Sequence, residues 1–402
     1  MKILQTNIEN CSACGSSNLK QAVRMDNLPH VGVYVKNINE ESNYPFVDNN
    51  LNVCMDCGHA QLSYALDPNF LYSTNFQHCT SCSMSAKQAN DWLYHFIISS
   101  VQKDFDVVAE IGINDSYFLQ KFAEKSKKVI GIDPILKNNE ARLIDNVPAG
   151  LKEKFIVIGD FIENVNFLDY LDQKPDLYIS NFVFEHIKQP KDVIENILGS
   201  CKDDAIIVIG VPGSEFLYEN SRFDQLSHQH YQQFTKHSLR LCVERAGGEV
   251  IKIDTNFPNW GQIAIAFKKR TKNFTKYNTI MEIDPAYIFA SYNNFGTQIE
   301  SLKNRFKSLK KKEKFGFGAA QNFPVFASFY KEKMPFDFIL DDNPQRQSQF
   351  YPNLPYRIKA PHSDGSYVGK VGVMTGPDYA RVLMARMSRL GFDHIVVPFN
   401  SY

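Results

Sequence analysis

The sequence predicts an α/β protein with a doubly wound parallel sheet at its centre, a cysteine-rich N-terminal domain and a second, smaller α/β domain. Three observations predict this: two CxxC pairs near the start, apolar runs that alternate with helical periodicity in the middle, and a return of that alternation near the end. Strands that alternate with helices favour a parallel sheet, because each crossover helix covers a sheet face. At 402 residues the chain exceeds one ordinary core, and the expected domains are 1–85, 86–270 and 271–402.

The central block supplies most of the periodic elements. Strands are expected at 105–111, 128–132, 155–158, 177–180, 205–210 and 250–253. Helices are expected at 87–102, 117–125 and 190–201, and a fourth from an N-cap at Thr235 to the pair Gly247 and Gly248. A long helix at about 285–311 then leads to a block with expected strands at 315–318, 338–342, 370–375 and 394–398, and helices from about Pro324 and Asp378.

Composition argues against two classes of partner. Lys and Arg number 44, as do Asp and Glu, so the basic excess of a nucleic-acid-binding surface is missing. The longest apolar stretch, 205–212, is far below the ~18 residues that a membrane span requires. The first residues turn polar at once, unlike a signal peptide. We therefore expect a cytoplasmic monomer or weak homodimer with a small-molecule substrate and neither a nucleic-acid nor a membrane partner.

Two CxxC pairs, each followed by glycine, predict a four-sulfur zinc site. They consist of Cys11, Cys14, Cys54 and Cys57. A CxxC turn directs two thiolates at one point, and the glycine tolerates the tight backbone. Four thiolates complete a tetrahedral Zn²⁺ and leave no open position, so the expected role is structural.

The remaining cysteines and one histidine are expected to play no part in that site. Cys79 and Cys82 form a third pair without a partner pair and are expected to be reduced thiols. Cys201 and Cys242 lie in helical patterns and are expected in the core. His59, beside the second knuckle, is expected on the surface rather than as a fifth ligand.

A strand that runs into a glycine turn predicts a nucleoside site. Glu110, Gly112 and Asn114 belong to this turn, and Asp133 ends the next strand about twenty residues later, the spacing at which a carboxylate accepts both ribose hydroxyls. A dinucleotide would favour GxGxxG, and the acids Glu110 and Asp115 would repel its phosphates. The cationic nucleoside S-adenosylmethionine suits these residues better. The alternative is a turn that merely forms a βαβ corner.

The adenine is expected at the end of the following strand. Asp160 would accept a hydrogen bond from it and Phe161 would stack on it.

With these motifs placed, the sequence resembles the sugar C-methyltransferases that act on nucleotide-linked 4-keto-deoxysugars. The likeness covers essentially the whole chain and implies a class I methyltransferase core, an N-terminal zinc domain and a C-terminal Rossmann-like domain. The segments that resemble family motifs are 110–115 (E-I-G-x-N-D), 181–187 (N-V-x-E-H-I), 211–212 (V-P), 316–319 (G-Y-G-A) and 341–344 (D-x-N-P).

The active-site motif departs from the family pattern. The pattern is close to D-x-x-Y-H-E-H, and here it reads Asp224-Gln-Leu-Ser227-His228-Gln229-His230. The resemblance makes His230 the catalytic base, while Ser227 replaces the Tyr and Gln229 the Glu. The family's paired tyrosines fall on Phe76 and His78, which leaves three histidines as candidate donors: His78, His186 and His228.

The chemistry leaves the methylated atom open. Methylation of carbon next to a ketone requires a base and a donor that stabilises the enolate oxygen. The carboxylate partner of the base would be Glu185 or Asp224. Methylation of oxygen or nitrogen requires only one base and proximity to the methyl group. The changes in the active-site motif therefore leave an O- or N-methyltransferase, acting on a sugar or another small acceptor, as an alternative. A non-catalytic module that retains the cofactor fold is the alternative from another class.

Overall fold

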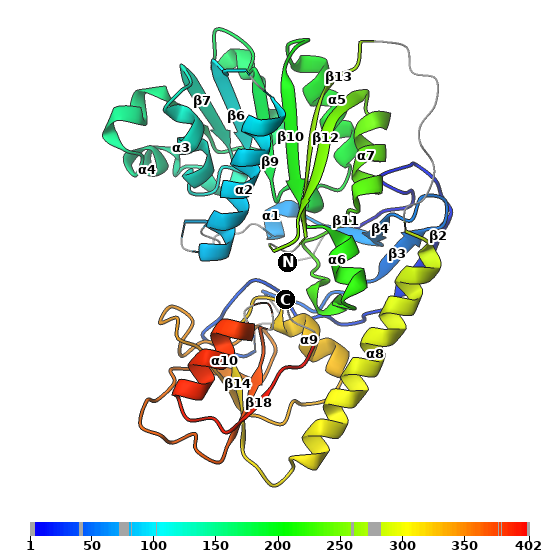
Figure 1. The fold of residues 1–402 in the computed structure, drawn as a ribbon, viewed down its shortest axis with the longest axis vertical. Coiled ribbons are helices and arrows are strands. Elements are labelled where there is room, and N and C mark those ends of the chain that lie inside the picture. Colours follow the sequence, from blue (N-terminus) through cyan, green and yellow to red (C-terminus); the bar gives the residue numbers. More distant parts are fainter. Residues whose placement is uncertain are drawn as a thin grey trace.

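The computed structural model describes residues 5–39, 43–71, 80–81, 83–101, 103–258, 261–271, 283–376, 378 and 380–399. Phe76, His78, Cys79 and Cys82 lie outside the described residues. No helix among those described is long and apolar enough to cross a membrane. The predicted domain boundaries near 85 and 270 stay predictions, and the three sheet-bearing regions are described in turn (Figure 1).

The central sheet has seven strands in the order β12-β13-β10-β9-β6-β7-β8. Their bounds are β6 Val107–Ile111, β7 Lys128–Ile132, β8 Phe155–Ile158, β9 Leu177–Asn181, β10 Ile206–Val211, β12 Gly248–Asn256 and β13 Gln262–Lys269. β6 to β10 run parallel, whereas β13 is antiparallel to both β10 and β12. The prediction of a wholly parallel sheet is therefore wrong at this edge, because the short connection between β12 and β13 can only form a hairpin.

Helices cover both faces of this sheet. α2 (Met84–Ser100) and α3 (Tyr117–Ala123) pack on one apolar face, and α5 (Pro190–Ser200) and α7 (Lys236–Arg245) pack on the other. The short α4 (Glu140–Asp145) contacts β8. α7 begins after Thr235, whose hydroxyl accepts a hydrogen bond from Ser238 N–H in a capping box, as the sequence predicts. Because helices cover both faces of the sheet, the ends of its strands are the part that a ligand can reach.

The N-terminal region contributes two small antiparallel sheets. β1 (Gln5–Asn7) pairs with β5 (Tyr64–Leu66), and α1 (Pro68–Leu71) follows. The second sheet has the order β11-β4-β3-β2, formed by β2 Leu19–Val23, β3 Leu51–Cys54, β4 Ala60–Leu62 and β11 Gln232–Gln233. β11 belongs to the central region of the chain, so this pairing attaches the segment around residue 230 to the cysteine-rich domain.

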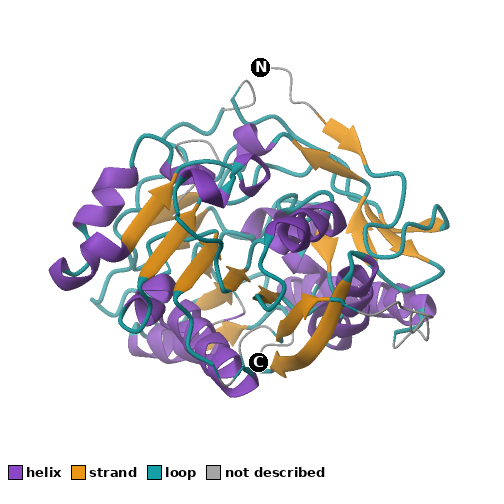
Figure 2. Ribbon diagram, turned by 90° about the horizontal axis from the view of Figure 1, so that it is seen from above, coloured by secondary structure: helices purple, strands orange, loops and turns teal. Residues whose placement is uncertain are grey.

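The C-terminal region is reached through the long helix α8 (Pro285–Ser308), drawn in yellow in Figure 1. Its five parallel strands have the order β16-β15-β14-β17-β18, with bounds β14 Lys314–Phe317, β15 Phe338–Leu340, β16 Arg357–Lys359, β17 Val371–Met374 and β18 His394–Val396. The helices are α9 Phe323–Tyr330 and α10 Ala380–Arg389. Ile288, Phe295 and Leu302 of α8 join one apolar core with residues of the N- and C-terminal regions, so the regions pack together. Figure 2 shows the helices and strands of the molecule from above.

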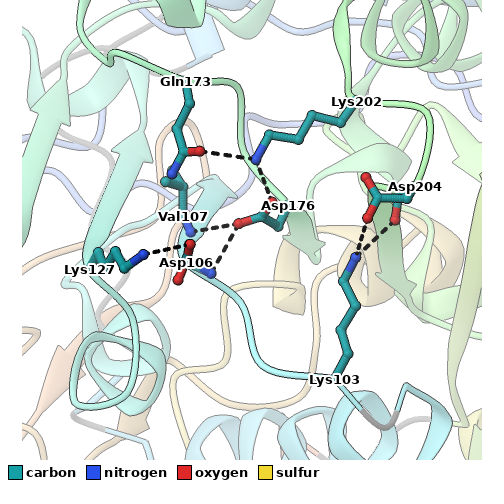
Figure 3. A network of polar contacts seen from close by, with 8 residues as sticks. All are labelled: Lys103, Asp106, Val107, Lys127, Gln173, Asp176, Lys202 and Asp204. Atoms are coloured by element: carbon teal, nitrogen blue, oxygen red, sulfur yellow. Dashed lines mark hydrogen bonds and ion pairs between the residues drawn. The ribbon is translucent and has the colours of Figure 1, made fainter.

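Lysine–aspartate contacts gather at the amino ends of the parallel strands (Figure 3). Asp176, just before β9, accepts hydrogen bonds from the backbone N–H groups of Asp106 at 3.0 Å and Val107 at 2.9 Å, and Lys202 Nζ lies 2.5 Å from it. Two further pairs join Lys127 to Asp106 at 2.8 Å and Lys103 to Asp204 at 3.0 Å. Each of these three carboxylates therefore has a lysine partner.

Candidate active site and metal centre

The four predicted metal ligands meet at one point. Cys11 Sγ lies 3.6 Å from Cys57 Sγ, Cys14 Sγ lies 3.5 Å from Cys54 Sγ, and all four sulfurs lie within 4.8 Å of one another. Sulfurs bound to tetrahedral zinc at about 2.3 Å would be roughly 3.8 Å apart, close to the distances here. The cluster therefore fits a closed, structural Zn²⁺ site, and the prediction of zinc binding is confirmed.

The glycines that follow the knuckles adopt the expected conformation, but His59 does not lie where it was expected. Gly15 has φ +78° and Gly58 has φ +72°, in the left-handed region that favours glycine. His59 is fully buried, with Nδ1 3.1 Å from Ser238 Oγ and Nε2 2.9 Å from Gln232 Oε1. The surface prediction for His59 is wrong, because the pairing of β11 with β4 covers it. Cys201 and Cys242 are buried, as predicted.

A cavity of about 840 Å³ opens at the carboxyl ends of the parallel strands of the central sheet. Every predicted cofactor residue lines it, namely Glu110, Gly112, Asn114, Asp133, Asp160 and Phe161. Two of the predicted catalytic histidines, His186 and His230, line it as well. This edge is where ligands bind in open α/β sheets, so the fold brings the predicted cofactor and substrate residues to one space.

The turn after β6 requires glycine for two reasons. Gly112 has φ +82°, and a Cβ at this position would lie 2.3 Å from Val183 Cγ2. The turn is fixed further by Asp133, whose Oδ2 accepts a hydrogen bond from Asn114 N–H at 3.0 Å. The absence of a side chain at Gly112 leaves backbone at the cavity wall, which suits close approach of a nucleoside.

The carboxylates of this end differ in their surroundings. Asp133 Oδ1 accepts a hydrogen bond from Ile135 N–H at 3.1 Å, and burial raises its pKa. Asp160 is half-buried, and hydrogen bonds from Asn164 Nδ2 at 2.8 Å and Phe161 N–H at 2.7 Å lower its pKa. Asp133 and Asp160 follow neighbouring strands, so one nucleoside could contact both. These residues fit a nucleoside cofactor such as S-adenosylmethionine, and the expected positions of the ribose at Asp133 and of the adenine at Asp160 and Phe161 stay predictions.

Glu110 is the most deeply buried acid at the cofactor end. It is 4 % exposed, and its Oε2 has no hydrogen-bond partner within the described part of the chain. Burial, with repulsion from Asp115 and Asp133, raises its pKa well above the ordinary value. A cationic ligand would offset this repulsion, whereas a phosphate would increase it.

A chain of buried amides, which the sequence did not reveal, fixes the floor of the cavity. Asn181 Nδ2 donates to Asn90 Oδ1 at 3.0 Å, and Asn181 Oδ1 accepts from Gln262 Nε2 at 2.9 Å. Asn256 Nδ2 extends the chain to Gln262 at 3.2 Å. Phe182, which follows Asn181 in the sequence, lines the cavity and has φ +57°, an unusual conformation for an aromatic residue. Asn90, Asn181 and the pair of Asn256 and Gln262 are far apart in the sequence, so this chain of amides carries no local signal.

At the acceptor end, Glu185, His186 and His230 lie together. One polar atom of each lies within 4.8 Å of the others, and the rings of His186 and His230 have centroids 4.8 Å apart. His186 Nδ1 lies 2.8 Å from Gln229 O, and a carbonyl only accepts, so Nδ1 carries the proton and Nε2 presents a lone pair. Within the described residues no hydrogen bond engages the ring of His230. Burial and His186 lower the pKa of His230 to about 3.

Glu185 is the carboxyl neighbour of the two histidines. It is 2 % exposed, its Oε1 lies 3.9 Å from His186 Nε2, and its Oε2 has no partner within the described residues. Burial raises its pKa to about 8. The other predicted candidate for this role, Asp224, instead forms a two-point ion pair with Arg222, at 2.7 and 2.8 Å.

His228 and Ser227 do not line the cavity. His228 is 2 % exposed, its ring centroid lies 4.6 Å from that of His30, and its Nε2 accepts a hydrogen bond from Val31 N–H at 3.4 Å. Ser227 is buried as well. The donor role predicted for His228 stays a prediction, and the proposal below does not use it.

The C-terminal region closes the cavity. Gln321, after β14, and Asp378, after β17, both line it. Arg222 is fully buried and donates to Asp378 Oδ1 at 2.9 Å, while Gln225 Nε2 donates to Asp378 Oδ2 at 3.2 Å and Gln225 Oε1 accepts from Asn322 Nδ2 at 2.9 Å. The carboxyl ends of the two parallel sheets therefore face one space.

Comparison with known proteins supports both parts of this description. A model of a methyltransferase domain matches residues 87–253, and a model of a zinc binding domain matches residues 11–72. The C-methyltransferase NovU of Streptomyces niveus is 22 % identical over 262 residues, which are 64 % of this chain and 60 % of NovU. The match thus spans about three fifths of that relative.

Solved structures of methyltransferases are also similar to part of this chain. The N-methyltransferase NodS from Bradyrhizobium japonicum WM9 with S-adenosyl-L-homocysteine is 13 % identical, with 46 % of this chain and 88 % of that chain covered and a TM-score of 0.35. The 1,6-didemethyltoxoflavin-N1-methyltransferase of Burkholderia thailandensis is 15 % identical, with 47 % and 80 % covered and a TM-score of 0.36.

The match to the methyltransferase domain model and the strand order confirm the predicted fold and cofactor class at the level of the domain. The strand order places one antiparallel strand beside a parallel α/β sheet, the matched model covers that sheet, and the four-cysteine cluster lies within the second matched segment. The chain contains a class I S-adenosylmethionine-dependent methyltransferase domain preceded by a zinc-binding domain.

Proposed function

We propose that this chain transfers a methyl group from S-adenosylmethionine to a deoxysugar, at a carbon next to a keto group, with His230 as the base. The resemblance in sequence adds that the sugar is linked to a nucleotide. The observation that carries the proposal is the shared cavity, which joins the glycine turn and Asp133 to His186 and His230. When bound, the cofactor supplies a methyl group on a positively charged sulfur that carbon can attack.

His230 is suited to accept a proton because its ring is neutral. Its pKa of about 3 keeps the imidazole unprotonated at working pH, and within the described residues no hydrogen bond occupies its nitrogens. The low pKa also makes it a weak base, so proton removal depends on stabilisation of the developing enolate. The T-shaped contact with His186 fixes the orientation of the ring.

Glu185 is the group that we assign to stabilisation of the enolate oxygen. Its pKa of about 8 leaves it protonated near pH 7, so the buried side chain presents an O–H donor at the cavity wall. It would take the place of the family tyrosine, since Ser227 is buried and lies off the cavity wall. A protonated carboxyl at an apolar site is an established kind of oxyanion donor.

The second candidate is methyl transfer to oxygen or nitrogen. Gln229 has replaced the acidic partner of the base, and its Nε2 donates to Val31 O at 3.4 Å rather than to His230. A heteroatom acceptor requires one base and proximity to the methyl group, which His230 alone could supply. A non-catalytic module would bind the cofactor and never turn over.

The test is formation of S-adenosylhomocysteine with a panel of deoxysugars, free and nucleotide-linked. We expect His230→Asn to lower turnover by about 10³-fold, or ~4 kcal/mol of transition-state stabilisation, with cofactor binding unchanged. His228→Asn is the matched control, because His228 lies off the cavity and its loss should leave turnover within about threefold in a folded protein.

Three outcomes separate the candidates. Exchange of the α-proton of the sugar into deuterated water, abolished by His230→Asn, indicates carbon transfer. Turnover without exchange indicates a heteroatom acceptor. Cofactor binding with no turnover on any sugar would reject the proposed deoxysugar acceptor.

A further inference from the structure

Glu185, His186 and His230 share a property that the proposed methyl transfer does not use, which is that their metal-ligating atoms converge. One ligand atom of each lies within 4.8 Å of the others, and His186 Nε2 is 3.9 Å from Glu185 Oε1. Donor atoms bound to one metal ion at about 2.1 Å would be roughly 3.0–3.5 Å apart. Side-chain movements on the order of 1 Å would therefore bring all three residues onto one ion.

Two segments of the fold hold these side chains in place. Glu185 and His186 are consecutive in the short 3-10 helix Phe184–His186, which follows β9. His230 lies just before β11, which contacts that helix and pairs with β4 of the zinc-binding domain. Folding alone assembles the cluster, so an ion would have to order little of the chain on binding.

The hydrogen bonds of the cluster are those of a metal site. His186 Nδ1 donates to Gln229 O at 2.8 Å, so the lone pair of the ring is on Nε2, the atom that faces Glu185. Metal-bound histidines usually have such a carbonyl acceptor on their other nitrogen. Glu185 is 2 % exposed, and its Oε2 has no hydrogen-bond partner among the residues that the structure describes. A metal ion would offset the cost of burying this oxygen.

We propose that Glu185, His186 and His230 form a second metal site, which binds one divalent transition-metal ion such as Zn²⁺ or Ni²⁺. Imidazole nitrogens favour these ions, whereas Mg²⁺ and Ca²⁺ favour oxygen ligands alone. All three residues line the cavity, and three protein ligands leave at least one coordination position open to it. The site therefore differs from the closed four-cysteine site, which has no position for a further ligand.

An ion at this second site would exclude the proposed methyl transfer. It would occupy the lone pair of His230 that removes the proton, and it would displace the proton of Glu185 to the solvent. Neither the base nor the donor to the enolate oxygen would then remain. Transition metals should therefore inhibit the enzyme. This consequence rests on the proposed function, whereas the metal site itself does not.

The first test is metal binding in the absence of any acceptor. The full-length protein, with one zinc per chain in its four-cysteine site, is titrated with Zn²⁺ by calorimetry. We expect one further ion per chain with a dissociation constant below about 10 µM, and no binding of Mg²⁺ at about 1 mM. The absence of a second equivalent of zinc would overturn the site.

Matched histidine variants locate the ion. His186→Asn and His230→Asn each remove one ligand and should weaken the second equivalent by more than about tenfold, since loss of even an outer partner of a ligand can cost that much. His228→Asn removes a histidine that does not line the cavity and should leave this binding unchanged. Retention of one zinc and of S-adenosylhomocysteine binding shows that each variant is folded. Equal binding by all three variants would overturn the assignment.

Inhibition tests the link to methyl transfer. Turnover is measured in the one-zinc protein and again after the second equivalent is added. We expect a loss of about 100-fold or more, because removal of a general base costs that much, and recovery when a weak chelator removes only the second ion. Unchanged or increased turnover with two ions bound would overturn the exclusion. No turnover in the one-zinc protein would instead contradict the proposed function and leave the metal titration as the test of the site.

Discussion

The two ends of the central sheet both collect acidic residues, but they surround those residues differently. At the amino ends, Asp176 accepts two backbone hydrogen bonds and contacts Lys202, and the neighbouring aspartates each have a lysine (Figure 3). At the carboxyl ends, Glu110 and Glu185 are buried, and each has one carboxyl oxygen without a partner among the described residues. Acidic side chains thus have stabilising partners at the amino ends, whereas at the carboxyl ends their burial lowers the stability of the fold.

The difference separates groups that serve folding from groups that serve a ligand. An aspartate that has a lysine partner and accepts backbone hydrogen bonds, as Asp176 does, contributes to stability without any ligand. A buried carboxyl without a cation has a raised pKa, as Glu185 does at about 8, and such groups cluster at functional sites. Substitutions at the amino ends should therefore lower stability and leave catalysis intact, whereas those at the carboxyl ends should lower catalysis and raise stability.

The largest effect is expected from a substitution in the zinc site, which belongs to neither end of the central sheet. Because β11 pairs with β4 of the zinc-binding domain, the metal helps to position His230, two residues before β11. We expect Cys54→Ser to abolish zinc binding and to lower methyl transfer by more than about 100-fold, since a structural zinc contributes on the order of 10 kcal/mol to its domain. Metal content and turnover are measured together.

The control for this prediction is a cysteine outside the cluster. Cys201→Ser changes a buried thiol of the central region and should keep both zinc binding and turnover, at a modest cost in the free energy of unfolding. Full activity of zinc-free Cys54→Ser would show that β11 holds its place without the metal.

The next largest effect is expected for Glu185→Gln at the carboxyl end, which should raise the free energy of unfolding. The folded pKa of Glu185 is raised to about 8 from an ordinary 4.5, so its contribution to stability is present below 4.5 and is lost as pH rises through 8. Glu185→Gln cannot ionise. The variant should become more stable than the parent as pH rises, with a difference that grows by on the order of 3 kcal/mol between pH 5 and 8.5.

Urea unfolding at pH 5, 7 and 8.5 measures this difference, and turnover should fall in the same variant. A difference that stays constant across these pH values would mean that Glu185 titrates normally in the folded protein. The comparison between the two ends of the sheet would then lose its main support.

Local patterns in the sequence predicted which residues line the cofactor end, whereas at the acceptor end only His186 and His230, named from the family resemblance, were predicted. Gly112 and Asp133 follow directly from strand ends at a fixed spacing, and the four cysteines from the CxxC repeat. The burial of Arg222 could not be predicted in this way, because it depends on Asp224 and on Asp378, which is 156 residues away. Charged residues are seldom buried without such partners, so an isolated arginine predicts a surface position.

The antiparallel edge of the central sheet was not predicted, for a related reason. The run 262–269 is apolar and would serve as a parallel or an antiparallel strand, and the short connection before it decides in favour of the hairpin. β11 has only two residues, and its place depends on tertiary pairing with Gln61 and Ala60. The burial of His59 follows from that pairing, which explains why its surface prediction failed.

At the amino end, Asp176→Ala should destabilise the protein without affecting catalysis. It removes the acceptor of the Asp106 and Val107 N–H groups and the partner of Lys202, with a cost of about 2 kcal/mol. Urea unfolding and turnover at saturating cofactor measure the two properties. Loss of turnover in the folded variant would contradict the division between the two ends.

The smallest effect is expected for Lys103→Ala at the same end. Lys103 Nζ contacts Asp204 Oδ2 at 3.0 Å, but the side chain of Asp204 is 77 % exposed, so water can replace the lysine. The loss should be about 0.5 kcal/mol or less and should shrink further in 0.5 M salt, because exposed charges are screened. A cost equal to that of Asp176→Ala would mean that the lysines themselves, rather than the backbone hydrogen bonds of Asp176, stabilise this end of the sheet.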